Sequence, residues 1–327
     1  LMMQIPKEIF KAYDIRGIVG KTLTPEIVEA IGQALGSEAL ARKQSTICIG
    51  YDGRLSGPEL AGALSRGIRK AGVNVIQLGM VATPMVYFAA YELGTACGVM
   101  VTGSHNPPDY NGLKMVLAGE TLSGETIQSL RARIETGDLT AGEGTESHHD
   151  IAAAYIAKIA SDIKLARPMK IAVDCGNGVA GAYAKKLYEA LGCSVQELFC
   201  EVDGHFPNHH PDPSVPENLA DLIVALAKDD AEIGLAFDGD GDRVMMVDSA
   251  GNLLDGDHLL YIIAEHRYQQ GTLLGGVAGT LMTNLALEHQ FKKMQIAFER
   301  AKVGDRYVRE LLVKNHWQLG GENSGHI

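Results

Sequence analysis

Short runs of apolar residues alternate with longer amphipathic stretches along this chain. Residues 46–50, 98–101, 169–174 and 233–237 are apolar runs of strand length, and apolar residues at helical spacing precede or follow each run. Buried parallel strands have this continuous apolar character, whereas half-exposed strands alternate between apolar and polar residues. The repeated order of strand and helix therefore predicts an α/β fold with mostly parallel, helix-covered sheets.

The same pattern divides into three similar units. A polar stretch rich in Gly and Thr at residues 136–150 indicates a linker, and a third α/β pattern begins near Asp257. A chain of this length is too long for one small core. We therefore expect three consecutive, similar α/β domains with mostly parallel mixed sheets, at residues 1–150, 151–256 and 257–327.

Composition and charge narrow the class of protein. The 327 residues carry a formal net charge of −11 and contain no basic block, so we expect neither nucleic acid nor a membrane surface as a partner. The apolar runs are far shorter than the ~18 residues that a membrane helix needs. We also expect no secretory signal. The five cysteines are odd in number and lie mostly beside apolar strand residues, which favours free thiols in a cytoplasmic protein.

Three aspartates directly follow the predicted strand at 233–237. Asp238, Asp240 and Asp242 are separated by glycines, which let the backbone curl and bring the carboxylates together. Carboxylates ~4 Å apart repel by about 4 kcal/mol per pair at an effective dielectric of ~20, so a divalent cation would stabilise the cluster. Oxygen ligands with an open face suit Mg²⁺, whereas a calcium EF-hand loop would need Glu at the position of Ser249. An uncompensated acidic turn is the less favoured alternative.

Ser104 follows the apolar run at 98–101, where the C-terminal end of a parallel strand is expected and where α/β sheets bind ligands. A simple turn serine is the alternative, but Gly103 and the absence of aliphatic neighbours favour a nucleophile. A serine that carries a phosphoryl group needs cations nearby, and His105, Lys114 and the metal ion could supply them. The pair Asn111-Gly112 predicts a tight turn that brings Lys114 back toward the serine. No Gly-x-Ser-x-Gly motif is present, which disfavours hydrolases of that type.

Two further motifs are less specific on their own. Residues 11–17 read Lys-Ala-Tyr-Asp-Ile-Arg-Gly, and a surface strand with a structural ion pair between Asp14 and Arg16 explains them equally well. Residues 320–326 place a carboxylate, a hydroxyl and an imidazole on a glycine-rich loop. Such a loop could bind sugar hydroxyls, although a polar turn would have a similar sequence.

Together, residues 11–17, 102–107, 238–243 and 321–326 resemble the motifs of the α-D-phosphohexomutase family and follow the family's order. The resemblance implies an isomerase that interconverts hexose 6-phosphate and hexose 1-phosphate, with mannose, glucose or glucosamine phosphate as the substrate. It also implies Mg²⁺ as cofactor, a phosphoserine at Ser104 and a hexose 1,6-bisphosphate as intermediate and activator. Catalysis would then consist mainly of positioning and charge neutralisation.

The resemblance further implies a role for each motif residue. The catalytic residues would be Ser104, His105, Arg16 and Lys114. The ligands of Mg²⁺ would be Asp238, Asp240, Asp242 and an oxygen on Ser104. The substrate would be bound by Tyr13, Asn106, Arg243, Glu322, Ser324 and His326.

Two features depart from the family pattern. No segment matches the Arg-Ser-Gly-Thr loop of the family's fourth domain, and the last residues have the pattern of an incoming strand. We therefore expect a truncated third domain, an absent fourth domain and impaired turnover. Residues 1 to about 240 resemble bacterial phosphomannomutase/phosphoglucomutase, whereas residues from 244 onward resemble phosphoglucosamine mutase, which predicts a chimera.

Two alternatives to an active mutase stay open. The first is a non-catalytic chimeric or truncated fragment that binds Mg²⁺ without turnover, and the second, less favoured, is a metal-dependent phosphatase. A sheet cut before its last strand also leaves an open edge. We therefore expect self-association or local disorder after about residue 257.

Overall fold

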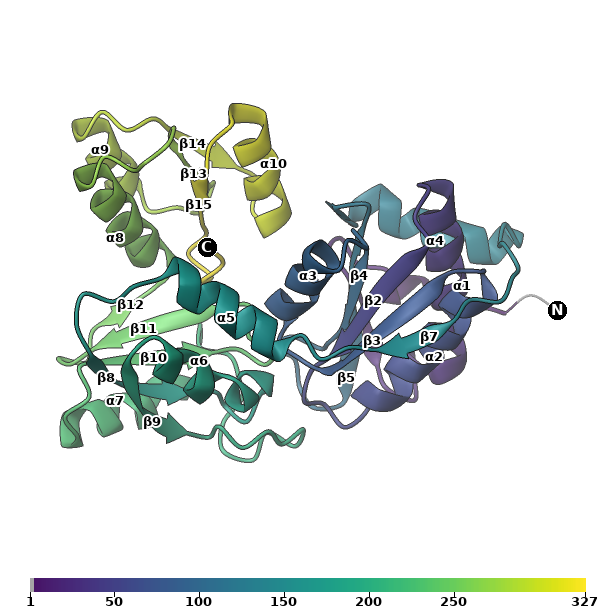
Figure 1. Cartoon of the computed structure of the whole chain (residues 1–327), viewed down its shortest axis with the longest axis horizontal. Helices are drawn as coiled ribbons and strands as arrows, with labels where there is room; N and C mark the ends of the chain where they lie inside the picture. The colour runs from purple at the N-terminus through teal and green to yellow at the C-terminus, as the bar shows by residue number, and fades with distance from the viewer. Residues whose placement is uncertain (1–2) are drawn as a thin grey trace.

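The computed structural model describes residues 3–327, which form three α/β domains in chain order (Figure 1). The first domain occupies one side of the molecule, and the second and third lie one above the other on the opposite side (Figure 1). The predicted architecture of consecutive α/β domains with mixed sheets is therefore present. Within residues 3–327, no helix combines the length and the apolar character that crossing a membrane requires.

The first domain is built on a seven-stranded mixed sheet in the order β1-β5-β4-β2-β3-β7, with β6 beside β5. Its strands are β1 (Ile15–Ile18), β2 (Thr46–Tyr51), β3 (Asn74–Met80), β4 (Gly98–Val101), β5 (Tyr110–Leu117), β6 (Glu120–Thr121) and β7 (Glu146–His148). Its helices are the 3-10 helix η1 (Lys7–Ile9), α1 (Pro25–Ala41), α2 (Gly57–Lys70), α3 (Thr83–Glu92) and α4 (Gly124–Thr136). Helices α1, α2 and α4 share one core, whereas α3 packs in a second core that includes Cys48 of β2.

The second domain has a five-stranded sheet in the order β12-β11-β10-β8-β9. Its strands are β8 (Met169–Asp174), β9 (Cys193–Leu198), β10 (Ile233–Phe237), β11 (Val244–Asp248) and β12 (Leu253–Leu254). Its helices are α5 (Ala152–Asp162), η2 (Val179–Ala182), α6 (Ala184–Ala190), η3 (Pro216–Leu219) and α7 (Ala220–Lys228). Strands β9, β8 and β10 are parallel, and β11 and β12 continue the sheet in antiparallel order.

The third domain has a parallel three-stranded sheet in the order β14-β13-β15. Its elements are α8 (Gly256–Gln269), β13 (Val277–Thr280), α9 (Leu285–Lys293), β14 (Phe298–Ala301), α10 (Asp305–Asn315) and β15 (Leu319–Gly320). The region after residue 257 thus contains regular secondary structure, and self-association stays a prediction. Gln295, three residues before β14, has a positive φ of 57°, which extended backbone does not allow.

Two local predictions were wrong. Residues 136–150 were expected to be a linker, but they contain β7, which pairs with β3. Asn111 and Gly112 were expected to form a tight turn, but both lie within β5. A Cβ atom at Gly112 would lie 2.1 Å from the carbonyl oxygen of Ile15, so this glycine allows the close approach of β1. The prediction of free cysteines is in agreement with the structure, since all five are unpaired thiols.

Helices α1 and α2 pack so closely that the contact requires glycine. A Cβ atom at Gly67 would lie 1.9 Å from the carbonyl oxygen of Glu29, whereas one at Gly62 would meet only the guanidinium of Arg66, at 3.7 Å. We expect Gly67→Ala to lower the free energy of unfolding by about 1–3 kcal/mol through overpacking. The control Gly62→Ala, on the same helix, should raise it by about 0.5–1 kcal/mol. Urea denaturation measures both values, and equal effects would contradict the close packing.

Candidate active site

Ser104 lies in the turn that directly follows β4 at the C-terminal end of the strand. Its φ is 56°, in the left-handed region that residues other than glycine seldom occupy. The Ser104 N–H donates to Thr102 Oγ1 at 2.8 Å, and the Ser104 hydroxyl lies 3.2 Å from His105 Nδ1. Backbone strain of this kind persists only where surrounding contacts enforce it, and it is common at functional residues.

The three aspartates lie in the turn after β10, where one oxygen from each carboxylate lies within 4.8 Å of the others. Asp238 Oδ2, Asp240 Oδ1 and Asp242 Oδ1 are buried oxygens that have no hydrogen-bond partner. Burial raises the pKa of Asp238 well above its usual range, and repulsion from the other two carboxylates adds to this shift. A divalent cation would satisfy the unpartnered oxygens and remove the repulsion, so this donor set fits Mg²⁺.

The turn that holds the three aspartates, residues 238–243, is called the acidic loop below. The first domain supplies a cation and a hydroxyl to this loop. Lys114 Nζ donates to Asp240 Oδ2 at 2.5 Å and to Asp242 Oδ2 at 2.9 Å. Burial lowers the pKa of Lys114, but attraction to these two carboxylates outweighs burial and holds the pKa well above its usual range. Thr83, at the start of α3, donates its hydroxyl to Asp240 Oδ2 at 2.6 Å. Sequence reasoning missed Thr83, for which the only local signal is the Thr-Pro start of the helix.

The segment between β4 and β5, residues 102–109, is called the serine turn below. The serine turn and the acidic loop are in direct contact. A Cβ atom at Gly239 would lie 2.1 Å from the Ser104 carbonyl oxygen, so the glycine between two aspartates allows the loops to meet. Arg243 Nη1 lies 3.4 Å from His105 Nδ1. Burial lowers the pKa of His105, and the charge of Arg243 lowers it further. A neutral His105 can therefore accept the hydroxyl proton of Ser104 at Nδ1.

The third domain reaches the acidic loop through residues 320–326. His326 Nε2 lies 3.3 Å from Asp242 Oδ2, and His326 Nδ1 lies 3.1 Å from Ser324 Oγ. Burial lowers the pKa of His326, but its hydrogen bonds with Asp242 and Glu322 outweigh burial and raise the pKa to about 9. Glu322 is buried and accepts the Gly304 N–H at 2.7 Å.

A cavity of about 270 Å³ opens beside this contact, where the three domains meet. Polar and charged side chains of both signs line one part of it, namely Tyr87, Asp242, Asp305, Arg309, Glu322 and His326. Sequence reasoning missed Tyr87, Asp305 and Arg309, because nothing in their local sequence indicates that α3 and α10 face the same cavity. A polar cavity with both charges is suited to a hydroxylated, phosphorylated ligand.

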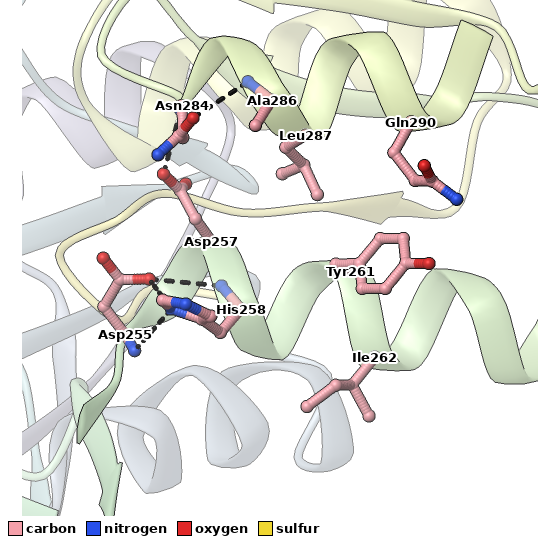
Figure 2. Close-up of a pocket in the computed structure, with 9 residues that line it drawn as sticks. All are labelled: Asp255, Asp257, His258, Tyr261, Ile262, Asn284, Ala286, Leu287 and Gln290. Carbon is pink, nitrogen blue, oxygen red and sulfur yellow. Dashed lines mark hydrogen bonds and ion pairs between the residues drawn. The ribbon is translucent and has the colours of Figure 1, made fainter. Parts of the chain in front are cut away.

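A larger cavity, of about 470 Å³, lies between α8 and α9 of the third domain (Figure 2). Its acidic groups belong to helix ends, because Asp255 caps α8 and Asp257 accepts the backbone N–H of Asn284 at the start of α9. The rest of its lining includes Tyr261 and Leu287 (Figure 2). None of the predicted site residues lines this cavity, so it is not the candidate active site.

Tyr13, Arg16 and Asn106 also make their hydrogen bonds outside the acidic loop. The Tyr13 hydroxyl donates to the carbonyl oxygen of Val303 at 3.0 Å, which links the first domain to the third. Arg16 forms the ion pair with Asp14 that was considered as a structural alternative, at 2.9 Å. The Asn106 amide donates to the Gly103 carbonyl oxygen and so stabilises the serine turn.

A strained serine beside an acidic, cation-fitting loop, at the meeting point of three α/β domains, is the arrangement of a multidomain α/β enzyme. Three models of one family match the chain: alpha/beta/alpha domain I at residues 7–141, domain II at 153–251 and domain III at 255–327. The chain belongs to the phosphoglucomutase/phosphomannomutase family, that is, the α-D-phosphohexomutases. The predicted family and fold class are thus confirmed.

Individual relatives agree with this assignment. The phosphomannomutase/phosphoglucomutase of Pseudomonas aeruginosa is 49% identical over 325 residues, which are 99% of this chain and 70% of that protein. The phosphoglucosamine mutase of Methylobacillus flagellatus is 41% identical over 338 residues, covering 98% of this chain and 74% of that protein. A crystal structure of a phosphoglucomutase/phosphomannomutase family protein from Burkholderia thailandensis has a TM-score of 0.95 and 45% identity, covering 98% of this chain and 72% of that one.

The left-handed conformation of Ser104 predicts a difference between two substitutions that both remove the hydroxyl. An L residue in this region costs about 1–2 kcal/mol, whereas glycine adopts it readily. We expect Ser104→Gly to have a free energy of unfolding about 1 kcal/mol higher than that of Ser104→Ala. Urea denaturation of the two variants checks this, and a Ser104→Ala variant at least as stable as Ser104→Gly would contradict the strain.

Proposed function

We propose that this chain interconverts hexose 6-phosphate and hexose 1-phosphate, with Ser104 as the carrier of the phosphoryl group. The observation that supports this proposal is the contact between the serine turn and the acidic loop, where three carboxylate oxygens lack partners. Relatives named phosphoglucomutase and phosphomannomutase support hexose phosphates as the substrate class.

Charge neutralisation would be shared between a metal ion and side chains. Asp238, Asp240 and Asp242 would hold Mg²⁺, which supplies positive charge to a phosphoryl group on Ser104 when it is bound. Arg243 would also neutralise charge on the phosphoryl group, because its Nε–H is buried and makes no hydrogen bond. That N–H can donate to a phosphoryl oxygen at little cost, because no existing hydrogen bond has to break.

The proposed reaction has two transfers of opposite direction. In the first, the Ser104 Oγ–P bond breaks, a bond forms between phosphorus and a sugar hydroxyl oxygen, and the sugar proton ends on Ser104 Oγ. In the second, the bond between phosphorus and the other sugar oxygen of the hexose 1,6-bisphosphate breaks, a bond forms between phosphorus and Ser104 Oγ, His105 Nδ1, at 3.2 Å, can take the serine proton, and the sugar oxygen gains a proton. Lys114, whose pKa is held well above its usual range, is proposed to donate the proton that the sugar oxygen gains, and Arg16 is the other proposed donor.

Sugar hydroxyls would be bound by the loop of the third domain, through Glu322, Ser324 and His326. The intermediate would have to turn over between the transfers, so that its other phosphoryl group faces Ser104.

The test of the proposal is direct phosphorylation of Ser104. We expect the purified chain, incubated with Mg²⁺ and glucose 1,6-bisphosphate, to gain the mass of one phosphoryl group, and Ser104→Ala to gain none. The control Ser129→Ala removes an exposed serine from α4 of the same domain and should be phosphorylated like the unchanged chain. EDTA should prevent the mass gain.

Two results would contradict this proposal. An unchanged mass would favour the non-catalytic fragment. Release of inorganic phosphate from hexose phosphates would favour the phosphatase instead.

One observation favours glucosamine phosphate among the possible sugars. Asp305 and Glu322 place two carboxylates in the cavity between the domains, and an amino sugar carries a positive charge that the other hexoses lack. The relative from Methylobacillus flagellatus, named phosphoglucosamine mutase, supports this candidate.

We therefore expect Asp305→Asn to lower kcat/KM for glucosamine 6-phosphate about fivefold, the effect of losing a surface ion pair worth about 1 kcal/mol. The value for glucose 6-phosphate, which has no ammonium group, should change less than twofold. Steady-state assays with both sugars check the difference. Equal losses for the two sugars would contradict recognition of the amine.

A further inference from the structure

Arg54 is a fully buried cation beside the serine turn, and the proposed reaction assigns it no role. It follows β2, and its side chain has 0% exposure. Its guanidinium donates to backbone carbonyl oxygens of the serine turn and of the first residue of β5, from Nη1 to Pro107 at 2.5 Å and Tyr110 at 3.0 Å, and from Nη2 to Asn106 at 2.8 Å and Ser104 at 3.3 Å. These bonds fix the carbonyl side of Ser104 and the residues that follow it.

The amide side of Ser104 is held by a second chain of hydrogen bonds that returns to Arg54. Thr102 Oγ1 accepts the Ser104 N–H at 2.8 Å and donates to Asp52 Oδ2 at 2.6 Å. Asp52 Oδ2 in turn lies 3.4 Å from Arg54 Nε. Burial raises the pKa of Asp52 to about 6, although Arg54 and Thr102 oppose the shift. The N–H and the C=O of Ser104 are therefore both linked by hydrogen bonds, directly or through Thr102, to the buried ion pair of Arg54 and Asp52.

The surrounding packing leaves this network little freedom. A Cβ atom at Gly103 would lie 2.4 Å from Arg54 Cζ, so the turn lies directly on the guanidinium. The ring centroid of Phe206, from the second domain, lies 5.2 Å from the same Arg54 Cζ. A buried ion pair often contributes little to stability compared with apolar residues of the same volume. A role in geometry accounts for the network better than a role in stability.

We infer that Arg54, acting through Asp52 and Thr102, is a positioning residue that holds Ser104 in its left-handed conformation for phosphoryl transfer. The inference rests on the proposed function. The physical reason is that a left-handed serine costs about 1–2 kcal/mol and relaxes unless its neighbours enforce it. The guanidinium donors point to backbone oxygens, so Arg54 acts on the orientation of Ser104 and not on the phosphoryl group.

The sharpest test changes Thr102, whose hydroxyl forms its hydrogen bonds with Ser104 N–H and Asp52 Oδ2, outside the acidic loop. Thr102→Val removes the acceptor of the Ser104 N–H and keeps the side-chain shape, whereas Thr102→Ser keeps the hydroxyl. At saturating glucose 1,6-bisphosphate, we expect Thr102→Val to phosphorylate Ser104 about 100-fold more slowly, the usual effect of a misplaced reacting group. KM should change less than about twofold, because binding of the sugar is untouched. Thr102→Ser should recover most of the rate.

A second test uses Arg54→Ala and a matched control in the same domain. Arg133 is another well-paired arginine, bound to Glu38 and Asp138, and it lies away from the serine turn. Arg133→Ala should lower stability without changing the rate at which Ser104 is phosphorylated. Arg54→Ala should lower that rate, and guanidinium chloride well below denaturing concentrations should restore part of it.

Each outcome decides for or against the inference. If the unchanged chain is phosphorylated but Thr102→Val reacts at the same rate, the network is only structural and the inference is wrong. It is also wrong if Thr102→Val raises KM and leaves the saturated rate intact. If the unchanged chain gains no phosphoryl group at all, the proposed function fails and the inference fails with it. If Arg54→Ala does not fold, the pair of Thr102 variants decides alone.

Discussion

The contact between Gly239 and the Ser104 carbonyl oxygen is the constraint on which the rest of the site depends. Any side chain at position 239 would lie 2.1 Å from that oxygen, so only glycine lets the first and second domains meet here. The contact places a hydroxyl beside buried carboxylates that repel one another. Lys114 and Thr83, both from the first domain, offset part of that repulsion at Asp240. The two domains therefore stabilise each other at the point where the chemistry is proposed.

The third domain contacts both of the other domains. Its loop reaches Asp242 of the second domain through His326, and a Cβ atom at Gly325 would lie 2.5 Å from the carbonyl oxygen of Val244, so this contact also requires glycine. Its contact with the first domain includes the exposed hydrogen bond from Tyr13 to Val303, which stabilises weakly. The close backbone approaches at Gly239 and Gly325 therefore both involve the second domain, which joins the other two.

The residues that the sequence identified are those whose signal is local. Alternating Asp and Gly after an apolar strand, and a serine at a strand end, can be read from a few neighbouring positions. Thr83 could not be found in this way, because its partner Asp240 lies 157 residues further along the chain. The strand β7 was missed because its residues are exposed, so its sequence has no apolar pattern. Gly112 was misread because the strand that approaches it belongs to a distant segment.

Three cations, Arg54, Lys114 and Arg243, bind the serine turn or the acidic loop, and the bonds that they already make separate their roles. The donors of Arg54 Nη1 and Nη2 point to backbone carbonyl oxygens, so they are committed before any ligand binds. Arg243 keeps a buried Nε donor that makes no hydrogen bond and lies 3.9 Å from Asp238 Oδ2, and Lys114 binds carboxylates whose charge a metal ion would share. A phosphoryl group that adds about two negative charges can therefore recruit Lys114 and Arg243 but not Arg54. Arg54 therefore stays bound to the backbone of the serine turn during the reaction, whereas Lys114 and Arg243 can bind the phosphoryl group.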